Sequence, residues 1–281
     1  VDSLSEKLVP EFSPVLGGSA PVFAAAAPVN LEARRESELS AEIDDLALGV
    51  MAKYWDAGQV KTRLGVSIGM QQAAQLHRSF VRHLSVSLAR LPSRKIICLS
   101  PSDRIGKLQN HLESWGLADD WDTMPQGDGD LGQRMCRWFA DCLASAPGAG
   151  PARAILVGAD CPTLDAARIR EADRALHRNN VVIGPAADGG YYLIGLRGPW
   201  GQHRREFESL FRSIPWGTSR VFAMTQDRLR DARLSWARLE IAEDVDTVVQ
   251  LDRLRQRLCS ADDPRYQELR REIEQILAGN P

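Results

Sequence analysis

The sequence has almost no net charge, no cysteine framework and no long hydrophobic run. Its 281 residues contain 35 Lys and Arg against 37 Asp and Glu, so the formal net charge is −2. Without a basic surplus, the chain lacks the broad field that attracts nucleic acid or an anionic membrane. Nucleic acid is therefore not an expected partner, and any phosphate must be bound by a few placed side chains.

The cysteines and the apolar runs exclude two further classes of protein. The five cysteines form no CxxC pair and have no histidine near enough in sequence for a zinc site, so we expect buried, reduced thiols in a cytoplasmic protein. The apolar run 22–29 is far too short to cross a bilayer. The residues before it include Asp2, Glu6 and Glu11 and lack the basic start of a signal peptide. We expect no membrane span.

The chain divides into two parts by composition. Residues 1–45 are rich in proline, glycine and alanine and show no sustained hydrophobic period. We predict an N-terminal extension there, partly disordered or tethered. Residues 46–281 are predicted to form a single domain that ends in C-terminal helices.

From residue 46 onward, short apolar runs alternate with amphipathic segments of helical period. The predicted strands are 46–52, 95–99, 154–158, 181–184, 191–196 and 239–242, and the predicted helices are 70–91, 131–144, 165–177 and 247–258. Such alternation indicates an α/β fold in which helices cover both faces of a mostly parallel sheet. Ligands of such sheets bind beyond the carboxyl ends of the strands, so the residues that follow the strands are expected to face a common crevice.

Two segments resemble nucleotide-binding motifs, but one lacks the required structural context and the other lacks the required glycines. Residues 127–132 satisfy GxGxxG, but the preceding segment 121–126 is broken by a proline and is not a buried strand. Lys61-Thr62 ends like a P-loop, but Trp55 and Val60 stand where that motif needs glycines. The sequence therefore predicts neither a dinucleotide fingerprint nor a P-loop.

The loop after the first strand has the composition of an anion site. Lys53 ends the strand, Gly58 permits a tight turn, and Lys61 and Arg63 precede the next helix. An arginine can bind phosphate through two parallel hydrogen bonds. A solvated basic turn has the same composition, and spacing alone leaves both interpretations open.

Carboxylates follow two of the predicted strands. Asp160 comes directly after the strand 154–158, and Asp246 comes shortly after the last strand. Two carboxylates from different strand ends, together with phosphate oxygens and water, suit Mg²⁺ or Mn²⁺. Asp246 has an alternative role, because it stands where it could cap the helix that begins at residue 247.

A third polar group lies between two predicted strands, in the sequence Asp188-Gly-Gly-Tyr-Tyr. Asp-Gly is typical of a tight hairpin. The paired glycines Gly189 and Gly190 would also let a substrate approach the backbone, and Asp188 could act as a general base. Spacing alone does not choose between the two.

Taken in order, these motifs resemble a family of small bacterial GT-A-type transferases, the arsenosugar-biosynthesis-like glycosyltransferases. This family is related to the molybdenum-cofactor and phospholactate nucleotidyltransferases. The resemblance covers about residues 46–258 and is carried by six blocks: 53–64, 126–135, 158–164, 184–192, 214–218 and 244–247.

The resemblance implies the GT-A, or nucleotide-diphospho-sugar transferase, fold, which is Rossmann-like. This is a three-layer α/β/α arrangement around a mostly parallel mixed sheet. It also implies a reaction, the metal-dependent transfer of a glycosyl group from a nucleotide-diphosphate sugar to a small-molecule acceptor. Mg²⁺ or Mn²⁺ would stabilise the charge that develops on the leaving diphosphate.

The resemblance also implies roles for individual residues. The nucleotide would be bound by Met51, Ala52, Lys53, Lys61, Arg63 and Gln126. Asp160 and Asp246 would hold the metal, Asp160 thereby taking part in catalysis, and Asp188 would be the catalytic base. The sugar or acceptor would be bound by Gly189, Gly190, Tyr191, Trp216 and Thr218.

Two other functions remain open at this stage. One is a nucleotidyltransferase that activates a phosphorylated metabolite and releases pyrophosphate, although the first loop has few of the glycines that such enzymes use. The other is a non-catalytic nucleotide-binding module. It is suggested by Tyr54-Trp55-Asp56, which stands where family members commonly have a proline.

Overall fold

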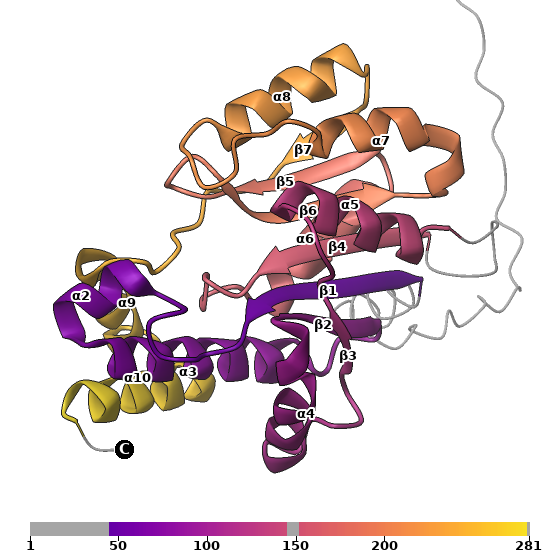
Figure 1. Ribbon diagram of the computed structural model, residues 1–281. Coiled ribbons are helices and arrows are strands. Elements are labelled where there is room, and N and C mark those ends of the chain that lie inside the picture. The colour runs from indigo at the N-terminus through magenta and orange to yellow at the C-terminus, as the bar shows by residue number, and fades with distance from the viewer. Residues whose placement is uncertain (1–44, 145–151, 280–281) are drawn as a thin grey trace, which may run out of the picture. The chain divides into compact units, whose positions relative to one another are not determined.

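The computed structural model describes residues 45–144 and 152–279, so the predicted extension lies, apart from residue 45, outside the described residues. Seven strands in these residues form one sheet of order β3-β2-β1-β4-β6-β5-β7 (Figure 1). The strands are β1 (Leu46–Lys53), β2 (Arg94–Ser100), β3 (Asp122–Pro125), β4 (Arg153–Gly158), β5 (Val181–Pro185), β6 (Tyr191–Arg197) and β7 (Trp236–Arg238). Only β6 runs antiparallel to its neighbours.

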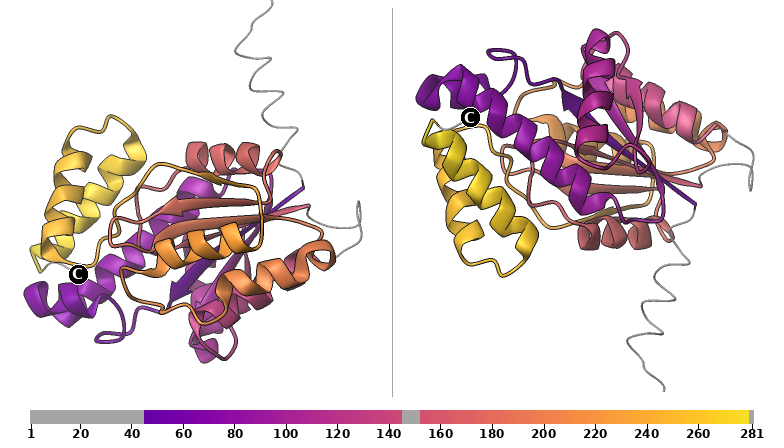
Figure 2. Two further views of the ribbon diagram at one scale, coloured as in Figure 1. Left: turned by 90° about the horizontal axis from the view of Figure 1, so that it is seen from above. Right: turned by 90° about the horizontal axis from the view of Figure 1, so that it is seen from below.

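Helices cover both faces of this sheet, and Figure 2 shows one layer from each side. One face packs against α3 (Met70–Leu88), α4 (Ile105–Ser114) and α6 (Ala166–Leu176), and the other against α5 (Leu131–Cys142), α7 (Arg204–Phe211) and α8 (Val221–Asp231). Successive side chains of β1 point to opposite faces of the sheet. Leu46 and Leu48 pack in the hydrophobic core on the α3, α4 and α6 side, and Ala47 packs in the core on the α5, α7 and α8 side. The predicted three-layer α/β/α fold with a mostly parallel mixed sheet is confirmed.

A third hydrophobic cluster lies beside the sheet, where α2 (Thr62–Ile68), α9 (Val248–Cys259) and α10 (Pro264–Leu277) pack on α3 (Figure 1). Its fully buried residues include Leu76, Phe80 and Leu254. This helical cluster matters for function because α2 begins directly after Lys61 and α9 shortly after Asp246. Two distant segments of the chain are thereby held at one place.

The structure differs from the prediction at the two edges of the sheet. β3 is not among the predicted strands, and its terminal Pro125 is tolerated because β3 pairs on one side only. The last strand is β7, not residues 239–242. Beyond it, Ala242 makes only an isolated bridge with Ala186, because Pro185 has no N–H with which to extend the ladder.

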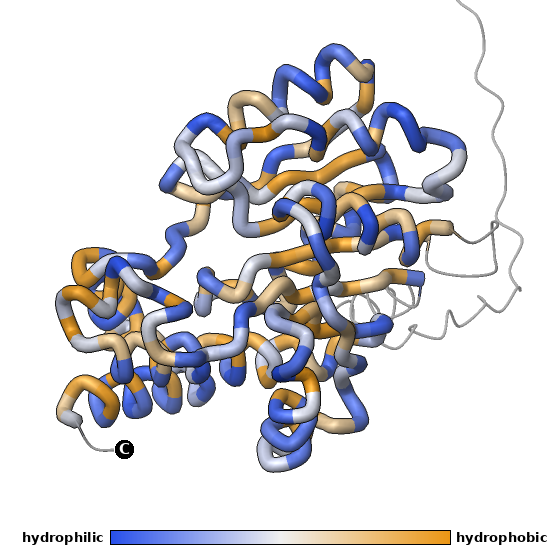
Figure 3. Tube along the Cα trace, viewed as in Figure 1, coloured by the Kyte–Doolittle hydropathy of each residue, from blue (hydrophilic) through white to orange (hydrophobic). Residues whose placement is uncertain are grey.

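Hydrophobic residues concentrate in the strands and recur along the helices (Figure 3). Among residues 45–144 and 152–279, no helix combines the length and apolar character needed to cross a membrane. All five cysteines are free thiols. The expectation that they are buried holds for three, but Cys136 is half-buried and Cys259 is exposed, because it lies past Leu258, the last buried residue of α9.

Candidate functional site

The register of β1 and β4 places the first two predicted site residues side by side. Met51 pairs with Gly158, so Lys53 and Asp160 follow two residues later at neighbouring strand ends. The Val245 N–H then donates to the Asp160 carbonyl at 3.0 Å. This bond ties the segment before α9 to the end of β4 and brings Asp246 to Asp160.

Lys61 lies between these two carboxylates. Its ammonium donates to Asp160 Oδ1 at 2.5 Å and to Asp246 Oδ1 at 2.9 Å. The Lys61 side chain is 2% exposed, whereas those of Asp160 and Asp246 are 49% and 39% exposed. The acids therefore face the crevice, and the base lies beneath them.

The charges of this trio stabilise one another. Burial alone would lower the pKa of Lys61, but the two carboxylates raise it above its ordinary value. Burial alone would raise the pKa of Asp160, but the Lys61 ammonium holds it below its ordinary value. Because two carboxylates face one ammonium, the trio has a formal charge of −1.

Lys61 adopts a backbone conformation that non-glycine residues seldom use. Its φ of 49° and ψ of 39° are left-handed, immediately before α2. This conformation costs an L-residue roughly 1–2 kcal/mol. Such strain persists where the surroundings hold it in place, here through the two ion pairs of the side chain.

Two residues that we do not predict for the site also lie in it. His77 Nε2 is 3.1 Å from the Lys53 carbonyl, which can only accept, so Nε2 carries the proton and Nδ1 lies 3.7 Å from Asp160 Oδ1. Burial lowers the pKa of His77 to about 4, and the ring is neutral at pH 7. Burial, followed by the charges of Asp160 and Asp188, raises the pKa of Asp244 to about 7. Asp244 could have been predicted from the sequence Asp-Val-Asp, which places it two residues before Asp246. His77 could not, because it lies within the hydrophobic pattern of a predicted helix and no motif marks it.

The carboxylate pair can be tested against the predicted metal. Asp160 and Asp246 have the oxygen ligands that Mg²⁺ and Mn²⁺ prefer. Their Oδ1 atoms, however, both accept from Lys61. In the part of the chain that the structure describes, no three His, Cys, Asp or Glu side chains are grouped to hold a metal. As they stand, these residues do not fit an ion held by the protein alone.

The alternative role of Asp246 as a helix cap is taken by its neighbour. Thr247 is the N-cap of α9, and its side chain accepts from the Gln250 N–H in a capping box. The Asp246 N–H donates to Gln250 Oε1 at 2.9 Å, while its carboxylate points to Lys61. The Asp246 side chain therefore does not cap α9.

The predicted nucleotide-binding residues fall into two groups. Gln126 Nε2 donates to the carbonyls of Ala52 at 2.9 Å and Cys98 at 3.0 Å, so this amide joins the ends of β1 and β2. Met51 and Gln126 line a cavity of about 200 Å³. Lys53 and Arg63 are exposed, and neither forms an ion pair within residues 45–144 and 152–279.

The unusual Tyr54-Trp55-Asp56 segment is turned toward α4. The rings of Tyr54 and Trp55 stack with centroids 4.5 Å apart, and Trp55 also contacts the ring of His111. Asp56 Oδ2 accepts from Arg104 Nε at 2.9 Å. The extra acid is therefore paired, and the aromatic rings anchor the loop.

The predicted sugar side begins at the turn between β5 and β6. Asp188 Oδ1 accepts from the Gly190 N–H at 2.8 Å, as expected for the hairpin interpretation, while Asp188 itself stays exposed. Gly189 has φ +92°, and a Cβ there would lie 2.3 Å from the Ser219 carbonyl oxygen. The glycine is needed for close packing against the loop that carries Thr218, whose hydroxyl donates to the Pro215 carbonyl at 2.8 Å.

Tyr191 and Trp216 complete this side. Their ring centroids lie 6.1 Å apart with the planes nearly perpendicular, at 89°. The Tyr191 hydroxyl and Trp216 Nε1 are both buried and have no hydrogen-bond partner. Buried donors are normally paired, so two orphans at one place require an explanation.

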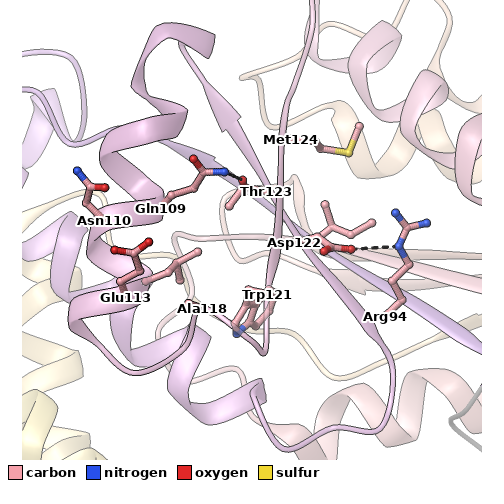
Figure 4. A pocket seen from close by; sticks show the side chains of 11 residues that line it. Arg94, Gln109, Asn110, Glu113, Ala118, Trp121, Asp122, Thr123 and Met124 are labelled. Atoms are coloured by element: carbon pink, nitrogen blue, oxygen red, sulfur yellow. Dashed lines mark hydrogen bonds and ion pairs between the residues drawn. The ribbon is translucent and has the colours of Figure 1, made fainter.

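A larger cavity, of about 740 Å³, lies between β3 and α4 and contains none of the predicted site residues (Figure 4). Four of its polar side chains form two pairs: Gln109 Nε2 donates to Thr123 Oγ1 at 3.1 Å, and Arg94 Nε donates to Asp122 Oδ2 at 3.3 Å. Met124, which lines this cavity, also lines the smaller cavity beside Met51 and Gln126.

A Desulfovibrio desulfuricans G20 protein, assigned provisionally as a nucleotide-diphospho-sugar transferase, is 32% identical; the match covers 84% of this chain and 98% of that one, with a TM-score of 0.70. Residues 85–218 match the family model described as an uncharacterized protein conserved in bacteria, DUF2064. The chain belongs to the DUF2064 family. Its fold is that of the nucleotide-diphospho-sugar transferases.

Two more distantly similar solved structures are found as well. A nucleotidyl transferase from Methanothermobacter is 15% identical, over 75% of this chain and 96% of that one, with a TM-score of 0.49. A Mycobacterium tuberculosis H37Rv protein crystallised with manganese is 17% identical, over 74% of this chain and 97% of that one, with a TM-score of 0.42. Among curated proteins, no sequence is significantly similar.

Proposed function

We propose that this DUF2064 protein transfers a glycosyl group from a nucleoside-diphosphate sugar to a small-molecule acceptor. The observation that carries the proposal is the position of Asp244. Its pKa is raised by burial and then by the charges of both Asp160 and Asp188. With Asp160 on the proposed diphosphate side and Asp188 on the proposed sugar side, the two sides would meet around this half-buried carboxyl group.

The chemistry needs a diphosphate site beside a sugar site. As the bond between the anomeric carbon and the diphosphate oxygen breaks, negative charge grows on the leaving diphosphate. Lys53 and Arg63 are exposed cations at the end of β1 and the start of α2 that would stabilise it. The attacking acceptor hydroxyl must lose its proton, and the exposed Asp188 carboxylate, oriented by the Gly190 N–H, would receive it.

The sugar side supports the same proposal. The Tyr191 hydroxyl and Trp216 Nε1 would donate to sugar or acceptor oxygens, which would relieve two unpaired buried groups. The provisional assignment of the Desulfovibrio desulfuricans relative agrees with this substrate class. Mg²⁺ or Mn²⁺ remains part of the proposal, but either ion would have to compete with Lys61 for the carboxylates of Asp160 and Asp246.

Product analysis tests the proposal. The full chain is incubated with a panel of nucleotide sugars and small acceptors, with Mn²⁺ or with a chelator, and nucleoside-diphosphate release is measured. We expect nucleoside-diphosphate release to depend on Asp188. Asp188→Asn should lower the rate of release about 100-fold, which is the lower end of the range for loss of one general base. Asp119→Asn, an exposed carboxylate outside the site, serves as the matched control. Pyrophosphate release from nucleoside triphosphates would instead indicate a nucleotidyltransferase, and release of neither product would contradict an enzymatic role.

A further inference from the structure

The two carboxylates assigned from the sequence to a divalent ion already hold a cation. We propose that Lys61 is the resident counter-ion of Asp160 and Asp246, and that a divalent ion must compete with its ammonium for them. The free protein would then bind Mg²⁺ or Mn²⁺ weakly, and tight binding would require the diphosphate of the substrate. The last step rests on the proposed function, whereas the competition itself does not.

The first support is the contact geometry. Lys61 Nζ lies 2.5 Å from Asp160 Oδ1 and 2.9 Å from Asp246 Oδ1. Mg²⁺ binds carboxylate oxygens at about 2.0–2.1 Å, so an ion bridging the same two oxygens would occupy the place of Nζ. An ammonium and a divalent ion cannot share this position, and each lowers the affinity for the other.

The second support is that Lys61 is built into the site. Its side chain is 2% exposed, and its ammonium lies 5.9 Å from the centre of the Phe80 ring. Its backbone is fixed at the start of α2, where Leu64 is fully buried. A surface lysine can turn its ammonium into water, but Lys61 could do so only if the backbone at the start of α2 moved. Its ammonium therefore stays at the two carboxylates and competes with any metal ion for them.

The third support is the charge that remains after this pairing. Lys61 offsets only one of the two carboxylates, so the trio keeps a formal negative charge. This charge repels a diphosphate that arrives alone, while Lys61 weakens the binding of a metal that arrives alone. A metal and a diphosphate together neutralise each other's charge, which is why the two would bind jointly.

Manganese alone is sufficient to test the competition. The affinity of the full chain for Mn²⁺ is measured by calorimetry or by electron paramagnetic resonance, with no nucleotide present. We expect Lys61→Met to bind Mn²⁺ at least about tenfold more tightly than the unaltered protein, a change of about 1.4 kcal/mol. Lys53→Met, which removes a nearby exposed charge, should change the affinity much less. An unchanged or weaker affinity in Lys61→Met would overturn the proposal.

A second readout covers a Lys61→Met variant that is unfolded without Mn²⁺ because its two acids are unpaired. In that case circular dichroism should show refolding on addition of millimolar Mn²⁺ but not of Na⁺ at equal ionic strength, and failure to refold would count against the proposal. A second variant, Lys61→Met with Asp246→Asn, removes one charge of each sign. It should bind Mn²⁺ no more tightly than the unaltered protein, and a gain equal to that of Lys61→Met would also overturn the proposal.

These measurements are independent of turnover. A glycosyl-transfer assay without product would reject the proposed function and leave the Mn²⁺ result standing. Conversely, if Lys61→Met does not bind Mn²⁺ more tightly, the competition with Lys61 is rejected, and the transfer assay still tests the proposed function.

Discussion

A buried basic side chain is paired with acidic side chains at each end of β4, and the two ends differ in whether those acidic side chains are exposed to water. At the amino end, Arg153 Nε donates to Asp173 Oδ1 at 2.6 Å, with side chains 9% and 1% exposed. At the carboxyl end, Lys61 is equally buried, but its partners Asp160 and Asp246 are 49% and 39% exposed.

This difference separates an ion pair that holds the fold from one that can also meet a ligand. A pair whose acid and base are both buried does not face a ligand in the crevice. A pair whose acids face a crevice retains oxygen atoms for an incoming group. The open pair lies at the carboxyl end of the strand, where α/β sheets bind their ligands.

The largest expected effect is on stability, at the closed end of β4. Asp173→Asn removes the carboxylate beside the buried Arg153 guanidinium, and we expect a loss of about 3–5 kcal/mol in the free energy of unfolding. Urea denaturation measures this loss. Turnover per folded molecule should not change, and a large loss of turnover would remove the distinction between the two ends of β4.

A buried histidine away from both ends gives a pH test of stability. His83 Nε2 is buried without a partner, beside Tyr266 of α10, and burial lowers the pKa of His83 to about 4. The unfolded chain, with a histidine pKa near 6.5, binds more protons between these values, so the His83 contribution to stability is lost as pH falls from about 6.5 to 4.

Replacing this ring tests its share of the pH dependence. His83→Gln should remove on the order of 3 kcal/mol of the acid destabilisation, measured by urea denaturation at pH 7 and pH 4.5. Some dependence should persist, because the pKa of His77 is also lowered, to about 4. An unchanged pH profile would show that His83 accepts a proton at no cost in the folded state.

At the open end of β4 the effect should fall on function. Asp160→Asn keeps the shape of the side chain and leaves Lys61 paired with Asp246, so we expect less than about 1.5 kcal/mol of lost stability. We expect about a 100-fold loss of transferase turnover, equivalent to about 2.7 kcal/mol. Parallel unfolding and kinetic measurements decide this, and the comparison fails if stability drops as far as in Asp173→Asn.

The smallest effect is expected from a pair of neighbouring tyrosines. The Tyr191 hydroxyl has no partner, whereas the Tyr192 hydroxyl donates to the Glu240 carbonyl at 3.2 Å. Tyr191→Phe should leave stability unchanged and raise KM for the donor or acceptor by about fivefold, or roughly 1 kcal/mol. Tyr192→Phe should cost about 1 kcal/mol of stability with KM unchanged. The reverse pattern would place the sugar site elsewhere.

Much of the fold was predictable because the central strands are continuous apolar runs. β1, β2 and β4 are each predicted to within two residues, since strands covered on both faces need hydrophobic side chains throughout. The edge strands β3 and β7 were not predicted. Each is half-exposed and short, with the sequences Asp-Thr-Met-Pro and Trp-Ala-Arg, so no hydrophobic pattern marks them.

The candidate site was predictable to a similar degree. Asp160 and Asp246 were assigned to one crevice because both follow predicted strands, and the structure brings them together although residues 239–242 form no strand. Gln126 was assigned to the nucleotide from the resemblance alone, and its amide is bonded to two strand carbonyls. The metal and nucleotide roles themselves stay predictions.

The amino-acid sequence by itself determined the alternating strands and helices, and with them the end of the sheet at which polar residues collect, because periodicity and strand direction are local properties. Only the tertiary structure decided which cation the two acids hold. Lys61 and Asp246 are 185 residues apart in the chain, and no local pattern records that α2 and α9 pack together. That packing places an ammonium where the spacing of the carboxylates had suggested a metal.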